Sequence, residues 1–130
     1  MVQNISITKD PIDECALASA RKVSGSAGGL VSFQGVVRDK EGGDKIAGIE
    51  YEAFQEMAEH QFRKILREVE QRWPIESVSI VHRIGFVPAG VPSLWVEVAA
   101  AHRREAFEAC EYLIDQMKVR VPIWKHPRRS

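Results

Sequence analysis

The sequence contains little that would suit an exported, membrane-bound or disulfide-stabilised protein. Cys15 and Cys110 are its only two cysteines, and they form neither a CxxC motif nor a Cys/His ligand pattern. Reduced thiols, and hence a cytoplasmic location, are therefore expected. No apolar run approaches the roughly 20 residues that span a bilayer. The N-terminal residues also lack the basic start and apolar block of a signal peptide.

An excess of charge of either sign is also lacking. The 18 basic and 18 acidic residues give a formal net charge of zero, so no overall field attracts nucleic acid or a membrane. Residues 118–130 nevertheless contain five basic residues and no acidic one. This asymmetry predicts an anion-binding site near the C-terminal end, with a solvated basic tail as the alternative. RNA binding by the same stretch is disfavoured, because RNP-like and helix-turn-helix patterns are absent.

Common catalytic motifs are missing as well. The sequence has no GxGxxG, GxxxxGK[ST] or HExxH motif, no Ser/His/Asp order and no acidic cluster that could hold a metal. Gly42 and Gly43 indicate a hairpin turn. His82 alternates with apolar residues and is interpreted as a core histidine or one that supports a site indirectly. Cys110 lies on an apolar helical face and is interpreted as an inert buried thiol.

What the sequence does contain is the composition of a soluble globular protein. Of its 130 residues, 45% are hydrophobic and 28% are charged. A chain of this length can bury its own core, so one domain over residues 1–130 is expected. Period-two alternation predicts strands at about 2–8, 30–38, 46–53, 77–84 and 93–101. Spacing of 3.6 residues predicts helices over 12–23, 55–73 and 103–121. Strand pairs without an intervening helix favour an α+β fold with a largely antiparallel sheet.

The last predicted helix should end at Pro122 and bury an apolar face. The residues on that face are Phe107, Cys110, Leu113, Ile114 and Met117. Beyond the proline, Trp124 is expected to anchor the returning chain against the body of the protein.

Two lysines flank this reversal of the chain. Lys118 lies in the last helical turn, where a cation interacts favourably with the helix dipole, so a structural role would also explain it. The returning chain could bring Lys125 close to Lys118, although spacing alone leaves this open. A lysine desolvated beside other cations has a lowered pKa and can act as a nucleophile or proton donor.

Two further groups of basic residues are candidates for the same site. Arg38 ends the strand 30–38 on the face opposite Phe33. His102, Arg103 and Arg104 stand where a strand passes into the last helix. A helix N-terminus suits phosphate binding, yet cations are unfavourable there for the helix itself, which points to a function. Ordinary surface arginines are the alternative. Lysines and arginines converging on one pocket would hold a phosphate and a carboxylate together.

Five segments of the chain resemble the molybdopterin synthase large-subunit family. They are VSFQGVVR at 31–38, WP at 73–74, VHRIG at 81–85, AHRREAFEA at 101–109 and MKVRVPIWK at 117–125. Each segment is weak alone, but all five occur in the family's order and spacing. The resemblance therefore covers nearly the whole chain and is specific.

The resemblance implies a fold and a reaction. The fold is an α/β-hammerhead-like α+β domain with a mainly antiparallel sheet and an additional small antiparallel subdomain. A homodimer would bind two small ubiquitin-like subunits, giving a heterotetramer. The Gly-Gly C-terminus of each small subunit, carried as a thiocarboxylate, would deliver sulfur to cyclic pyranopterin monophosphate and so form the molybdopterin dithiolene. Because the sulfur arrives on the partner, no cysteine, metal or other cofactor of this chain is implied.

The resemblance also implies roles for particular residues. Lys118 and Lys125 match the family's catalytic lysines, with Lys118 contacting the thiocarboxylate carbonyl or acting on the pterin and Lys125 assisting. Arg38, His102 and Arg103 match the positions that would hold the substrate phosphate. Phe33 and Met117 match pocket-lining residues, although an ordinary core role would also explain them.

The sequence departs from the family at two places. Family members often continue with a charged tail well past the WK segment, whereas this sequence stops at Ser130. Val91 follows Gly90 where an acidic residue is common, which is expected to alter only a loop. The first departure supports an alternative interpretation, a non-catalytic homologue that binds the small subunit or a phosphorylated ligand without turnover.

Overall fold

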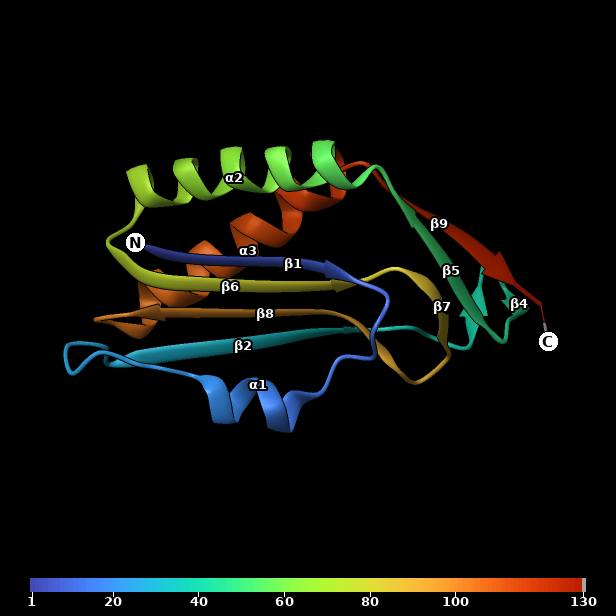
Figure 1. Ribbon diagram of the computed structural model, residues 1–130, viewed down its shortest axis with the longest axis horizontal. Coiled ribbons are helices and arrows are strands. Elements are labelled where there is room, and N and C mark those ends of the chain that lie inside the picture. The colour runs from blue at the N-terminus through green and yellow to red at the C-terminus, as the bar shows by residue number, and fades with distance from the viewer. Residues whose placement is uncertain (130) are drawn as a thin grey trace.

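The computed structural model describes residues 1–129, which form three helices and nine strands (Figure 1). The helices are α1 (Glu14–Ala20), α2 (Gln55–Arg72) and α3 (Arg103–Arg120). The strands are β1 (Val2–Thr8), β2 (Gly29–Val36), β3 (Lys40–Glu41), β4 (Asp44–Lys45), β5 (Gly48–Ala53), β6 (Ile75–Arg83), β7 (Gly85–Pro88), β8 (Pro92–Ala100) and β9 (Ile123–Arg128). Within residues 1–129, no helix is long and apolar enough to cross a membrane.

The main sheet has four strands in the order β1-β6-β8-β2 (Figure 1). β1 runs parallel to β6, whereas β6 and β2 each pair antiparallel with β8. The predicted α+β fold with a mainly antiparallel sheet is confirmed. β8 lies in the interior of the sheet and is buried almost throughout, so its side chains are shielded on both faces.

Helices α2 and α3 pack against one face of this sheet. The buried apolar residues of α2 recur every three or four positions; they are Ala58, Phe62, Ile65, Leu66 and Val69. They share one core with Leu113 of α3 and with Val78 and Val96 of the sheet. Burying a side chain of this size contributes about 1.5–3 kcal/mol. The core therefore holds α3 firmly across the sheet.

A second antiparallel sheet has three strands in the order β7-β5-β9. With the short hairpin of β3 and β4, it forms the additional small antiparallel subdomain that the family resemblance implied. The hairpin turns at Gly42 (φ 57°) and Gly43 (φ 88°), so the predicted turn is confirmed. Ile49 of β5 and Val87 of β7 belong to a second, smaller core beneath this sheet.

The sequence did not indicate β7 or β9. β9 contains Pro127, which cannot donate a ladder hydrogen bond and therefore argues against a strand. The strand lies at the edge of its sheet, however, where a proline is tolerated. Its pairing with β5 places Lys125 opposite Tyr51.

Helix α1 is shorter than the predicted range 12–23. The Asp13 side chain accepts a hydrogen bond from the backbone N–H of Ala16 (3.1 Å) and so caps the N-terminus. At the other end the backbone becomes extended at Arg21. The Arg21 guanidinium there donates to the buried carboxylate of Glu97 on β8, with Nε 2.7 Å from Oε1. This contact on the sheet ends the helix early.

Two apolar side chains that the sequence predicted to be buried are exposed, so these two predictions are wrong. Phe107 is 59% exposed, because α3 turns Ala106 and Ala109 towards the core and leaves Phe107 outside. Trp124 is 50% exposed, since strand alternation places it on the opposite side of β9 from Ile123, which packs against the cores. The returning chain is held by strand pairing and not by Trp124.

Candidate functional site

A cavity of about 620 Å³ lies where the C-terminal part of α3 and the end of β2 meet the small sheet. Its wall combines cationic, apolar and hydroxyl-bearing side chains that are far apart in the sequence. Five residues that the sequence identifies as site candidates line it: Phe33, Arg38, Met117, Lys118 and Lys125. The fold therefore brings these five together.

Three cations define the electrostatic character of the cavity. Lys118 comes from the last turn of α3, Lys125 from β9, and Arg38 from the segment that follows β2. No carboxylate occurs among the described residues that line the cavity. Lys125 reaches this wall because β9 pairs with β5, so the chain reversal after α3 returns the second lysine towards the first. The arrangement suits a small molecule with more than one negative charge.

Phe33 and Met117 supply apolar surface beside these cations. Phe33 lies on the edge strand β2 and is 38% exposed, whereas Met117 is half-buried at the end of α3. Leu94 of β8 continues the apolar wall. A flat ring with a charged substituent would contact both kinds of surface.

His102 and Arg103 do not line the cavity. His102 is the N-cap of α3, and Lys118 lies near the opposite end of this 18-residue helix. At 1.5 Å per residue, Arg103 and Lys118 are separated by about 22 Å along the helix axis. Arg103 also lies beside Gly29, at the far end of β2 from Phe33. Within one chain, the structure does not bring the two proposed phosphate-binding groups together.

Three polar residues that the sequence did not identify as site residues also line the cavity: Tyr51, His82 and Ser93. The Ser93 hydroxyl donates to the Tyr51 oxygen at 3.0 Å. The Tyr51 ring packs edge-to-face against the His82 imidazole, with ring centroids 5.3 Å apart. Burial raises the pKa of Tyr51, so its hydroxyl stays protonated.

His82 is also buried in this wall, at 6% exposure. Its Nδ1 is 2.8 Å from the backbone oxygen of Arg83, and because a carbonyl only accepts, Nδ1 must carry the proton. The pKa of His82 is lowered to about 4: burial is the main cause and the positive charge of Lys125 adds to it, while the hydrogen bond to the Arg83 backbone opposes the shift. The imidazole is therefore neutral near pH 7, with its other nitrogen free to accept.

Cys110 takes no part in the cavity lining. It is 5% exposed within the main core, and burial raises its pKa to about 11. The interpretation of Cys110 as a buried, unreactive thiol is confirmed. No group of described side chains within residues 1–129 has the composition of a metal site.

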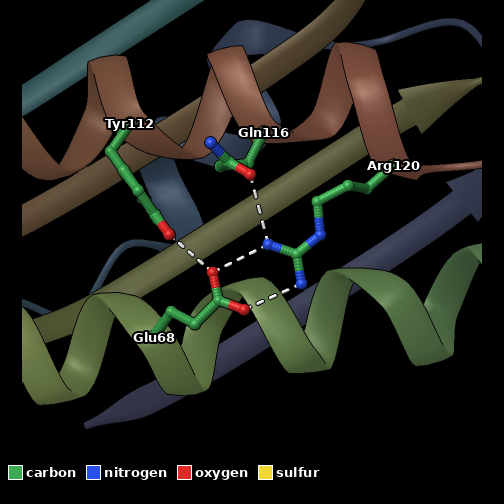
Figure 2. A network of polar contacts seen from close by, with 4 residues as sticks. All are labelled: Glu68, Tyr112, Gln116 and Arg120. Atoms are coloured by element: carbon green, nitrogen blue, oxygen red, sulfur yellow. Dashed lines mark hydrogen bonds and ion pairs between the residues drawn. The ribbon is translucent and has the colours of Figure 1, made fainter.

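A polar network fixes the end of α3 that carries Lys118. Figure 2 shows Tyr112 and Arg120 of α3 pointing towards Glu68 of α2. The Arg120 guanidinium donates to both carboxylate oxygens at 2.7 and 2.8 Å, and the Tyr112 hydroxyl donates at 2.5 Å. Hydrogen bonds from Arg120 and then Tyr112 lower the pKa of Glu68 to about 2. The paired contacts resist rotation of the helix end.

The family model described as MoaE protein matches residues 7–120 of the chain. The chain belongs to the MoaE family. This confirms the resemblance to molybdopterin synthase large subunits.

Relatives and solved structures agree with membership of the MoaE family. A molybdopterin synthase catalytic subunit from Pyrococcus abyssi is 44% identical over 122 residues, which cover 93% of this chain and 82% of the relative. The human molybdopterin synthase catalytic subunit is 38% identical over 124 residues, which cover 95% of this chain but only 64% of the relative. The chain thus spans less than two thirds of its human relative.

The fold matches solved structures closely. The crystal structure of molybdopterin synthase from Staphylococcus aureus superposes with a TM-score of 0.88 at 34% identity, covering 96% of this chain and 90% of that one. A complex of subunits 1 and 2 of molybdopterin-converting factor from Helicobacter pylori matches with a TM-score of 0.75 at 25% identity, covering 98% and 84%.

Proposed function

We propose that this chain is the catalytic subunit of a molybdopterin synthase. It transfers sulfur from the thiocarboxylated C-terminus of a small ubiquitin-like subunit to cyclic pyranopterin monophosphate, forming the molybdopterin dithiolene. The observation that carries the proposal is the convergence of Lys118, Lys125 and Arg38 in a cavity without a carboxylate. Membership of the MoaE family and the names of the relatives support it.

The proposed chemistry needs positive charge in two places. A thiocarboxylate and a phosphate are both anions, and negative charge develops on the acyl oxygen when the acyl carbon is attacked. Lys118 and Lys125 are proposed to stabilise this charge from fixed positions in the cavity, which lowers the barrier without reorganising solvent. Arg38 is proposed to bind the phosphate through paired N–H donors. Phe33 and Met117 are proposed to contact the pterin ring.

His102 and Arg103 are proposed to reach the phosphate from a second copy of the chain. Within one chain they lie at the other end of α3 from Lys118, so the expected homodimer is the arrangement that would deliver them to a neighbouring cavity. No side chain caps the N-terminus of α3, which leaves its first N–H groups available for an anion. The exposed Phe107 in the next turn would gain burial in such a dimer.

A reconstituted sulfuration assay tests the proposal. Lys118→Ala should lower product formation by at least about 10²-fold, because it removes a donor to the developing oxyanion. Lys64→Ala, which changes an exposed lysine of α2, should leave the rate unchanged. A folded Lys118→Ala variant that retains activity would contradict the assignment. If the unchanged chain bound the thiocarboxylated small subunit but formed no product, the chain would be a non-catalytic binding homologue.

A further inference from the structure

If the chain has the function proposed above, sulfur transfer leaves the small subunit bonded to the pterin through its acyl carbon, and this bond must be broken. When the thiocarboxylate sulfur bonds to a carbon of the pterin and displaces an oxygen substituent from that carbon, the sulfur remains bonded to the acyl carbon as a thioester. Release of the small subunit then requires oxygen to replace sulfur at that carbon. Water is the simplest nucleophile, and it must give up a proton as it attacks.

The cations of the cavity are poorly suited to accept that proton. Protonated lysine and arginine only donate hydrogen bonds, which applies to Lys118, Lys125 and Arg38 alike. Tyr51 and Ser93 are neutral hydroxyls that already bond to each other. No described side chain in the lining is a carboxylate. His82 is therefore the neutral nitrogen base of this wall.

The geometry of His82 leaves one ring nitrogen open to the cavity. Nδ1 is occupied by the backbone oxygen of Arg83 at 2.8 Å. Nε2 has no hydrogen-bond partner among the described residues. Among residues 1–129, the fully buried side-chain nitrogen and oxygen atoms that lack a hydrogen-bond partner are Arg83 Nε and Glu105 Oε2. His82 Nε2 is not one of them, so it keeps some solvent-accessible surface. Because His82 lines the cavity and is only 6% exposed, we infer that its free acceptor Nε2 faces the cavity.

The surroundings keep this acceptor in one orientation and one charge state. The bond to Arg83 and the edge-to-face contact with Tyr51 restrict rotation of the ring. Burial, with Lys125 nearby, holds the pKa of His82 near 4, so a proton taken up by the imidazole is readily passed on.

We propose that Nε2 of His82 accepts the proton from the water that hydrolyses the thioester between the small subunit and the sulfurated pterin. The water oxygen bonds to the acyl carbon as one of its protons moves to Nε2. The carbon–sulfur bond then breaks, its electron pair stays on sulfur, and sulfur takes the proton back from the imidazolium. The small subunit leaves as a carboxylic acid and the pterin as a thiol. Lys118 and Lys125 stabilise the oxyanion of the tetrahedral intermediate.

Two substitutions separate proton transfer from simple positioning. His82→Asn retains an N–H near Nδ1 for the Arg83 oxygen but removes the acceptor at Nε2. His82→Gln offers an amide oxygen that accepts a hydrogen bond but takes up no proton. His60→Gln, an exposed histidine of α2, is the matched control.

The experiment mixes each variant with thiocarboxylated small subunit and cyclic pyranopterin monophosphate, and follows the small subunit by intact-mass spectrometry after acid quench. Both His82 variants should form the thioester adduct at the normal rate and hydrolyse it about 10²-fold more slowly, so that the adduct accumulates. The His60→Gln chain should not accumulate it. Normal hydrolysis by His82→Asn would overturn the proposal. Normal hydrolysis by His82→Gln alone would overturn proton transfer, because hydrogen-bond acceptance would then suffice.

A measurement on the unchanged chain covers the case in which the variants fail to fold. Hydrolysis of the adduct should be constant near neutral pH and fall as the pH approaches about 4, where His82 becomes protonated. The charged and titratable side chains that line the cavity with His82 are Tyr51, Lys125, Lys118 and Arg38, and none of them is a carboxylate or a second histidine. A rate without an acid limb would refute the role of His82. If the unchanged chain formed no adduct and no product, the proposed function itself would fail.

Discussion

At the scale of single residues, His82 connects the chemistry of the cavity to the stability of the fold. Its burial disfavours the protonated form, while the same histidine in the unfolded chain titrates near its ordinary pKa of 6.5. Between these two values the unfolded chain binds more protons than the folded one. Acid therefore weakens the fold through this one side chain.

This difference predicts a measurable pH dependence. The contribution of neutral His82 should be complete above about pH 6.5 and should be lost as the pH falls towards 4, amounting to about 3 kcal/mol over that interval. His82→Gln has no titrating ring, so its free energy of unfolding should decline less over the same range. Urea unfolding at several pH values measures both slopes. Parallel slopes for the two proteins would contradict the prediction.

Sequence periodicity predicted the burial of His82 but not its position at the cavity. Alternation with Val78, Ile80 and Ile84 shows only that the side chain points inwards. Whether that interior is packed core or cavity depends on what covers the end of β6. The β5 strand, with Tyr51, covers it, and no local pattern around His82 reports this contact.

At the scale of secondary-structure elements, the end of α3 depends on its attachment to α2. Glu68 bonds to Arg120 and Tyr112 (Figure 2). Arg72 of α2 lies over the Tyr112 ring, with 4.5 Å between its guanidinium carbon and the ring centroid. Lys118 is two residues from Arg120. A helix end that rotates by a few degrees moves a long side chain out of register with a bound anion, so the network should influence activity as well as stability.

Removing the charge of Glu68 tests this attachment. Glu68→Gln should lower Tm by several degrees at pH 7 and reduce sulfuration several-fold, because Arg120 loses its carboxylate partner. The folded pKa of Glu68 is lowered to about 2, so its contribution is present above the ordinary value of 4.5 and is lost as the pH falls towards 2. The Tm difference should therefore shrink in acid.

Glu111→Gln provides the control, since it removes an exposed carboxylate from α3, the helix to which Glu68 bonds. An equal effect of the two substitutions, or a Tm difference that stays constant down to pH 3, would argue against a specific role of the network. Both outcomes can be read from thermal melts followed by circular dichroism.

At the scale of the whole molecule, the proposed substrate-binding residues fall into two groups at opposite ends of α3. Lys118 is at one end and Arg103 at the other. If two copies share each site, a dimer made from two different defective chains should recover activity.

Mixing chains that carry Lys118→Ala with chains that carry Arg103→Ala tests this sharing. In a mixed dimer, one of the two cavities would combine an intact Lys118 with an intact Arg103. Random pairing should therefore restore about a quarter of the normal activity, although neither variant is active alone. Differently tagged chains allow mixed dimers to be isolated. Isolated mixed dimers that remain inactive would show that the site is not shared in this way.

The presence of three helices, the four strands of the main sheet and the choice of the cavity lysines as candidates were predictable from the sequence alone. These features depend on local periodicity, turn chemistry and short motifs, which neighbouring residues encode. The structure was needed to show that Lys125 lies beside Tyr51 and His82, and that His102 and Arg103 lie elsewhere. The reason is that β9 becomes a strand through pairing with β5, about 74 positions away along the chain, and its proline is tolerated only because the strand lies at a sheet edge. Such long-range pairing leaves no periodic signal in the residues that it joins.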